Sequence, residues 1–306
     1  MLPNFLIVGA AKSGTTSVYE YLNDHPQVYM SPVKEPYFFS FMDTVPDFRG
    51  PFDEKTNKEE IITSRTEYEL LYEGVTDEIA IGESSNAYLY LEGTAENIKK
   101  LVPACKIVII LRDPVSRAFS HFLQHKMLGT ETLEFEKAIE KENERKQKNW
   151  RWHYQYADQG MYYGQVKRYL DVFGREQVKV YLFDNLVADP AQMMINLGQF
   201  LGIDPEFYNN YDFQRFNKTG LPKSQTMHHL IRHQNPVRKI AHAVVPLFLR
   251  ERMVSFIEKI NYNYEDKPTL DPDTKMKLKR LFEPDIKKTA GLIGRDLTMW
   301  LPEDRQ

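Results

Sequence analysis

Cysteine is nearly absent from this chain. Its 306 residues include a single cysteine, Cys105. One cysteine cannot form an intramolecular disulfide, and it cannot supply the several thiolates of a cysteine-based zinc site. Cys105 stands two residues before an apolar run. We therefore expect it to be a small buried residue beside a strand, and we expect no metal site.

Long hydrophobic runs and a strong net charge are also absent. The longest apolar stretches, residues 107–111 and 243–249, are much shorter than a membrane span. The chain begins in an apolar segment with no basic leader and no cleavage site. The formal net charge of −3 gives no general attraction to nucleic acid, although a local basic cleft is compatible with it. We expect a cytoplasmic protein, standalone or excised from a larger one, that neither spans a membrane nor binds nucleic acid.

Short apolar runs alternate with helical patterns along the chain. Val, Ile, Leu, Tyr and Phe dominate four runs that predict buried strands, at residues 5–8, 79–82, 106–111 and 178–183. Helical patterns follow residue 14, occupy 116–127 and 160–173, and run from an Asp189-Pro190 cap to residue 201. This alternation predicts an α/β fold, a doubly wound and mainly parallel sheet with helices on both faces.

The remaining segments fit one domain over residues 1–306. No repeat, low-complexity tract or clear linker divides the chain. The charged stretch 134–152 predicts a solvated helix. Residues 205–275 contain helical pieces punctuated by proline. We expect this C-terminal region to form a helical lid over the carboxyl edge of the sheet.

The turn between the first strand and the first helix has the composition of an anion-binding loop. It reads Gly9-Ala10-Ala11-Lys12-Ser13-Gly14-Thr15-Thr16. Backbone N–H groups at a helix N-terminus attract phosphate, and Lys12 adds a mobile positive charge. The hydroxyls of Ser13, Thr15 and Thr16 add further donors. The sequence therefore predicts a P-loop-like phosphate-binding loop.

The lysine spacing separates this loop from that of ATP and GTP enzymes. A Walker loop has lysine directly after its second glycine, whereas Lys12 precedes Gly14. Asp113 is the candidate magnesium ligand, but Pro114 follows it and indicates a helix cap. A magnesium-free site suits transfer of a sulfuryl group, which carries less negative charge than a phosphoryl group. A magnesium-dependent kinase or NTPase and a non-catalytic anion-binding module remain the alternatives.

Three segments resemble PAPS-dependent sulfotransferases, where PAPS is 3′-phosphoadenosine-5′-phosphosulfate. They are the loop with its strand at residues 5–17, the run 107–120, and the heparan-sulfate-type segment 31–39. The resemblance implies PAPS as donor and PAP (3′-phosphoadenosine-5′-phosphate) as product. It places Lys12 at the bridging oxygen of the leaving group and Arg112 and Ser120 on the 3′-phosphate. The 5′-phosphate would be held by the rest of the loop, Ala11, Ser13, Gly14, Thr15 and Thr16.

The same resemblance names two candidates for the general base. Glu35 would take the proton of the acceptor hydroxyl as its oxygen attacks sulfur in line. His125 is the competitor, because a histidine late in the 3′-phosphate helix lies near the acceptor in the heparan-sulfate branch. His121 lies one turn earlier on the same helix. The catalytic residues expected from the sequence are thus Lys12 with Glu35 or His125.

Two further expectations concern the closing loop and the acceptor. Residues 217–224, with Lys223 and Ser224, occupy the place of the basic loop that closes on the 3′-phosphate, although the cysteine-bounded hairpin of heparan-type enzymes is missing. Segment 31–39 also resembles sulfotransferase domains of modular polyketide and olefin synthases. That implies a β-hydroxyacyl chain on an acyl carrier protein as acceptor, with a glycan or glycolipid hydroxyl as the rival. Seven aromatic residues at 38–41 and 150–156 are candidates for an apolar acceptor cleft or for core.

Overall fold

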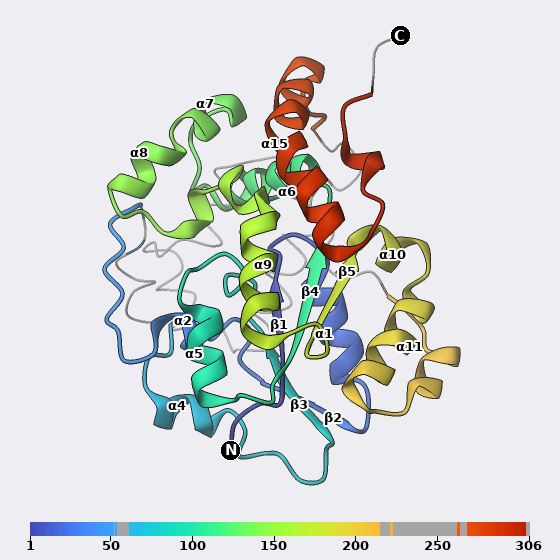
Figure 1. The fold of residues 1–306 in the computed structure, drawn as a ribbon. Helices are drawn as coiled ribbons and strands as arrows, with labels where there is room; N and C mark the ends of the chain where they lie inside the picture. The colour runs from blue at the N-terminus through green and yellow to red at the C-terminus, as the bar shows by residue number, and fades with distance from the viewer. Residues whose placement is uncertain (52, 54–60, 215–220, 223–261, 264–267, 304–306) are drawn as a thin grey trace.

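The centre of the fold is a five-stranded sheet in which every neighbouring pair is parallel (Figure 1). The structure is a computed structural model that describes residues 1–51, 53, 61–214, 221–222, 262–263 and 268–303. The strand order is β2-β3-β1-β4-β5. The strands are β1 (Phe5–Gly9), β2 (Val28–Met30), β3 (Ala80–Ser84), β4 (Lys106–Leu111) and β5 (Val178–Leu182).

Helices cover both faces of the sheet because its strands are apolar on both sides (Figure 1). In β1, Phe5 and Ile7 pack into one core cluster and Leu6 and Val8 into the other. The first cluster is completed by α1 (Thr15–Asn23), α10 (Phe183–Ala188), α11 (Pro190–Leu201) and the 3₁₀ turn η3 (Pro205–Asn210). The second is completed by α5 (Thr94–Leu101), α6 (Pro114–Leu128), α9 (Tyr162–Phe173) and α15 (Pro272–Ile293).

Three of these helices begin at an Asp-Pro pair. The carboxylates of Asp113, Asp189 and Asp271 accept backbone N–H groups in the first turns of α6, α11 and α15. Proline suits the first helical position, since its φ is already helical and no N–H is lost there. The expected caps at Asp113 and at Asp189 are therefore confirmed.

Shorter elements lie around this framework. The helices are α2 (Phe38–Phe41), α4 (Arg65–Leu70), α7 (Phe135–Glu140) and α8 (Glu142–Gln147). The 3₁₀ turns are η1 (Trp152–Tyr154), η2 (Asp158–Gly160) and η4 (Thr298–Trp300). Strand β6 (Leu221–Pro222) pairs antiparallel with β7 (Tyr262–Asn263).

The predicted α/β architecture and its four strands are confirmed, and β2 extends the sheet at the edge beside β3. The prediction of one solvated helix over 134–152 is wrong, because α7 and α8 form there with Glu142 and Arg145 buried. Most of the expected lid, 205–275, lies outside the described residues. In the part of the chain that is described, no helix is long and apolar enough to span a bilayer.

Candidate active site

The loop between β1 and α1 has the backbone of an anion cradle. Gly14 caps α1 at φ 86°, in the left-handed region that favours glycine, and a Cβ there would lie 2.6 Å from Leu186. Lys12 adopts a φ of 66°. The Ser13 hydroxyl is buried, and in the described part of the chain it has no hydrogen-bond partner. The loop therefore offers a glycine-dependent turn, the N-terminus of α1 and an unused hydroxyl donor.

A cleft of about 320 Å³ lies against this loop, at the carboxyl edge of the sheet. Its lining joins the loop to the segment after β2, the segment after β3, the end of β4 and one face of α6. Ligands bind at this edge in open parallel sheets. The predicted site residues that line the cleft are Lys12, Gly14, Thr15, Thr16, Glu35, Arg112 and Ser120. Ala11 and Ser13 are buried in the loop itself. Lys223 and Ser224 lie outside the described residues.

The cleft carries an excess of positive charge. Lys12, Lys34 and Arg112 line it, and Glu35 is the acidic residue in its lining. Among the described residues, neither Lys12 nor Arg112 forms a salt bridge, whereas the Lys34 ammonium lies 3.6 Å from a Glu35 oxygen and 2.7 Å from the Thr16 hydroxyl. Two cations that form no salt bridge in a concave site attract an anion.

Burial and mutual repulsion weaken the protonation of Lys12. Desolvation lowers the pKa of Lys12 to about 8, the nearby Arg112 charge acts in the same direction, and Glu35 opposes both. Burial likewise lowers the pKa of Arg112. A bound anion would reverse this effect by supplying the missing opposite charge.

Arg112 is fixed at the end of β4 by contacts on both sides. Its guanidinium donates to the Lys12 carbonyl at 3.0 Å and lies 4.6 Å from the centre of the Phe183 ring. The Tyr162 hydroxyl donates to the Arg112 carbonyl at 2.9 Å. Ser120 reaches the same cleft from α6. The structure thus brings the loop lysine, Arg112 and Ser120 together, as the sequence predicts.

Glu35 is held from both carboxylate oxygens. Asn86 Nδ2 donates to Oε1 at 2.6 Å, and the Tyr37 hydroxyl donates to Oε2. The backbone N–H of Glu35 donates to the Ser84 carbonyl at 3.0 Å, and its φ is 61°. The side chain is still 25% exposed. Glu35 therefore presents an oriented carboxylate to the cleft beside Lys12.

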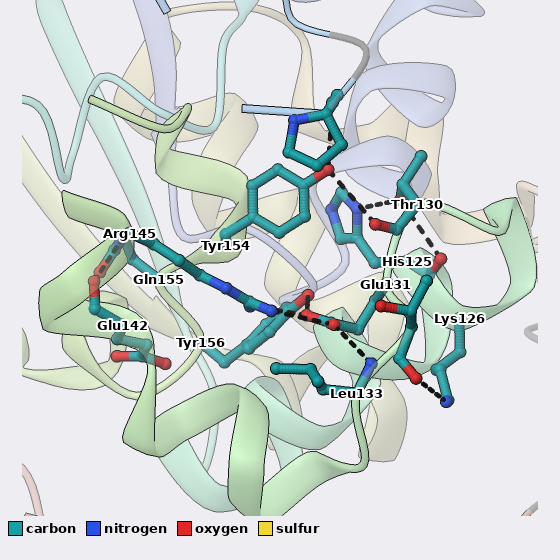
Figure 2. Close-up of polar contacts among 12 residues, drawn as sticks. His125, Lys126, Thr130, Glu131, Leu133, Glu142, Arg145, Tyr154, Gln155 and Tyr156 are labelled. Atoms are coloured by element: carbon teal, nitrogen blue, oxygen red, sulfur yellow. Dashed lines mark hydrogen bonds and ion pairs between the residues drawn. The ribbon is translucent and has the colours of Figure 1, made fainter. Parts of the chain in front are cut away.

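His125 lies elsewhere on α6. Residues Ser120, Gln124 and Met127 face the cleft, and His125 is not part of the lining. Adjacent helical positions are about 100° apart, so His125 points away from that face. Figure 2 shows its ring against Thr130, with Nδ1 2.8 Å from the hydroxyl. Burial lowers the pKa of His125 to about 4, so the ring is neutral at pH 7.

The surroundings of His125 are a buried polar network rather than a cleft. Glu131 accepts two hydrogen bonds from Arg145, at 2.6 and 3.0 Å, and one from Tyr156 at 3.0 Å (Figure 2). The ring of His125 lies 5.1 Å from that of His121 between centres. His121 is also buried, and desolvation lowers its pKa well below the usual value.

Several residues that line the cleft were not predicted from the sequence. Gln124 and Met127 follow Ser120 by four and seven positions, the spacing of one helix face, so helical periodicity was an available signal. Phe183 follows β5 at the same sheet edge. Of the aromatic residues considered for an acceptor cleft, those that the structure buries belong to the core: Phe38, Phe39, Phe41, Trp152, Tyr154 and Tyr156.

Comparison with known proteins finds sulfotransferases among the similar structures and sequences. A sulfotransferase crystal structure from Alicyclobacillus acidocaldarius is 35% identical, with a TM-score of 0.75 over 98% of this chain and 99% of that one. Human heparan sulfate glucosamine 3-O-sulfotransferase 5 is 30% identical over 71% of this chain and 58% of its own length. A mouse sulfotransferase solved with PAP shares the fold alone, at 14% identity and a TM-score of 0.50 over 93% of this chain and 85% of that one.

The chain spans between 22% and 58% of the length of such curated relatives. The family match itself extends over nearly the whole sequence, from residue 2 to residue 289. It includes the loop, Glu35, Arg112 and Ser120, and it favours sulfuryl transfer over the kinase and the non-catalytic module. The chain belongs to the sulfotransferase domain family.

Proposed function

We propose that this enzyme transfers the sulfuryl group of PAPS to a hydroxyl of its acceptor and releases PAP. The observation that carries the proposal is the pair of cations, Lys12 and Arg112, that line one cleft without a salt bridge among the described residues. The cleft also holds an unused loop hydroxyl at Ser13 and an oriented carboxylate at Glu35. A donor with two separate phosphate groups matches the two cations.

The loop residues and Arg112 have different tasks in this proposal. The N–H groups and hydroxyls of residues 13–16 bind the 5′-phosphate at the N-terminus of α1. Arg112 and Ser120 bind the 3′-phosphate, a task for which the planar guanidinium is suited. Lys223 and Ser224 are proposed to close on the same phosphate. Lys12 neutralises the negative charge that develops on the leaving oxygen as the sulfur–oxygen bond breaks.

Glu35 is the proposed general base. The acceptor oxygen forms its bond to sulfur while its proton passes to Glu35, and PAP leaves from the opposite side of sulfur. Asn86 and Tyr37 hold both carboxylate oxygens, so the base is oriented before the acceptor binds. His125 serves this role less well, because its ring lies outside the cleft lining and its Nδ1 is engaged with Thr130.

The acceptor is a hydroxyl of one of two kinds. A glycan hydroxyl agrees with the human 3-O-sulfotransferase relative. A β-hydroxyacyl chain on an acyl carrier protein agrees with the segment around Glu35, which resembles the synthase domains. A carrier-protein acceptor would place the enzyme in the cytoplasm.

Radiolabelled PAPS offered with each acceptor tests the proposal. We expect transfer to one of the two, by wild-type enzyme in the presence of EDTA. Glu35→Gln should lower kcat by about 10²–10⁴, the usual contribution of a general base, while His125→Gln retains most of it. No transfer to either hydroxyl acceptor would contradict the proposed reaction. Loss of transfer in His125→Gln but not in Glu35→Gln would move the base to His125.

A further inference from the structure

A second carboxylate lies buried behind the proposed base. Glu83, near the end of β3, is fully buried and forms no salt bridge among the described residues. Its Oε1 accepts hydrogen bonds from Tyr88 at 2.7 Å and Tyr68 at 3.1 Å, and its Oε2 accepts one from Ser85 at 2.7 Å. Burying an unpaired carboxyl group is costly, and an apolar side chain would fill this place in the core at less cost.

The hydrogen bonds of Glu83 continue to the cleft through Ser85. The Ser85 oxygen accepts the backbone N–H of Tyr37 at 3.3 Å, and the Tyr37 hydroxyl in turn donates to Glu35. Glu83, Ser85, Tyr37 and Glu35 are therefore linked in series, with the Tyr37 residue itself joining its backbone contact to its hydroxyl contact. It connects the interior of the sheet with the carboxylate that faces the cleft.

The segment that carries Glu35 needs such support. Glu35 and Tyr37 both have left-handed backbones, with φ of 61° and 56°. For residues other than glycine each of these conformations is uncommon, and it persists only where the surroundings enforce it. Two hydrogen bonds hold the segment against the end of β3. The Glu35 N–H donates to the Ser84 carbonyl, and the Tyr37 N–H donates to the Ser85 hydroxyl.

In its ionised form Glu83 accepts all three hydrogen bonds, from Tyr68, Tyr88 and Ser85, which requires an acceptor at residue 83. Ser85 has one proton, which it donates to Glu83, so a lone pair remains for the Tyr37 N–H. The Tyr68 oxygen already accepts the Tyr72 hydroxyl. Glutamine at this position would turn an N–H₂ group toward either Ser85 or the tyrosines. In the first orientation the Ser85 oxygen would accept from residue 83 as well as from Tyr37, and the Ser85 proton would lose its acceptor.

We propose that Glu83 is a positioning residue for sulfuryl transfer, which acts through Ser85 and Tyr37 to fix the Glu35 carboxylate in the cleft. The inference rests on the proposed function, because it takes Glu35 as the base. Glu83 itself touches neither donor nor acceptor. Replacing Glu83 should therefore lower the rate of the chemical step and leave the binding of PAP unchanged.

The test compares Glu83→Gln and Ser85→Ala with Tyr68→Phe as the matched control. Tyr68→Phe removes a hydroxyl from the same carboxylate but from the side away from Tyr37. We expect Glu83→Gln and Ser85→Ala each to lower kcat by about ten- to a hundredfold, the scale of a small misplacement of a catalytic group. Calorimetric Kd for PAP should stay within about twofold, and the double variant should be no slower than the slower single one, since both changes break one connection.

Several results would overturn the inference. Wild-type kcat in Ser85→Ala would do so, as would losses that multiply in the double variant. An equal loss of kcat in Tyr68→Phe, at an equal drop in Tm, would show that Glu83 is only structural. If Glu83→Gln does not fold, Ser85→Ala and Tyr68→Phe decide the question by themselves. Glu35→Gln separates the two proposals: if it is as active as wild type, the proposed base is wrong, whereas an inactive Glu35→Gln beside a fully active Ser85→Ala rejects the positioning role alone.

Discussion

Donor binding should weaken in mildly alkaline solution because of one lysine. Burial, assisted by the charge of Arg112, lowers the pKa of Lys12 to about 8 in the empty cleft. Raising the pH from 7 to 9 then reduces the protonated fraction from about nine tenths to about one tenth. If the bound phosphates keep Lys12 protonated, the Kd for PAP rises about tenfold across this interval, which corresponds to about 1.4 kcal/mol.

Calorimetric titration of PAP at pH 7, 8 and 9 measures this effect. The ligand does not interfere, since its phosphate groups have a second pKa near 6 and are already ionised. Repeating the titration in buffers of different ionisation enthalpy reports the protons taken up, which should approach one per PAP at pH 9. Lys12→Arg is the control, because arginine stays charged throughout and should give a flat profile.

Two outcomes would refute this reasoning about Lys12. The first is a Kd that is constant from pH 7 to pH 9 in the wild-type enzyme, without proton uptake. The second is the same rise in Kd in Lys12→Arg, which would assign the titration to another group.

Three further predictions concern stability, measured by urea unfolding. Gly82→Ala should lower the free energy of unfolding by about 1–3 kcal/mol, because the new Cβ would lie 2.3 Å from the Phe5 ring. Gly164→Ala, on the exposed side of α9 with nothing within 4 Å of the new Cβ, should raise it by about 0.5–1 kcal/mol. Equal effects of the two would contradict the packing described. Arg145→Met leaves Glu131 buried without its partner and should cost about 3–5 kcal/mol; a cost below 1 kcal/mol would show that the pair is dispensable. Burial raises the pKa of Glu83 to about 7, so between pH 4.5 and 7 the folded chain keeps a proton that the unfolded chain loses. The free energy of unfolding should therefore fall with rising pH across this interval, by about 3 kcal/mol from this group. Glu83→Gln should show a smaller dependence of stability on pH, and an equal dependence would contradict this assignment.

The sheet could be predicted because its strands are apolar on both faces. Residues 107–111 form an unbroken hydrophobic run, and β4 lies there with Lys106 at its start. Strand β2 has only three residues, Val28–Met30, and a run this short has no periodicity to recognise. The sequence therefore indicates the central strands of the sheet better than its edge beside β3.

The charged stretch 134–152 shows why composition misleads in places. Its charged residues predict exposure, but Arg145 pairs with Glu131 in the interior, and the Glu142 carboxylate accepts two backbone N–H groups after η1. A charged residue can be buried when its partner comes from another segment. Such partners depend on the tertiary fold and leave no local pattern in the sequence.

The same distinction applies to the site. Lys12, Arg112 and Ser120 lie in contiguous motifs, so spacing and resemblance place them in one cleft, and the structure agrees. The support of Glu35 comes from Asn86 and Ser84, about fifty residues farther along the chain, and only the pairing of strands brings it there. His125 shares a helix with Ser120, but the helical period puts it on another face, and the structure shows that this face packs beside Thr130.

Calorimetric binding of PAP, compared with AMP and ADP in the presence of EDTA, is the most direct test of PAPS as the donor. We expect tight binding of PAP that depends on its 3′-phosphate and needs no metal. Arg112→Ala should weaken PAP by about ten- to a hundredfold, the value of a charge-assisted hydrogen bond, and should leave AMP and ADP nearly unchanged. Equal affinity for ADP and PAP, or a requirement for magnesium, would contradict the assignment of this cleft to PAPS.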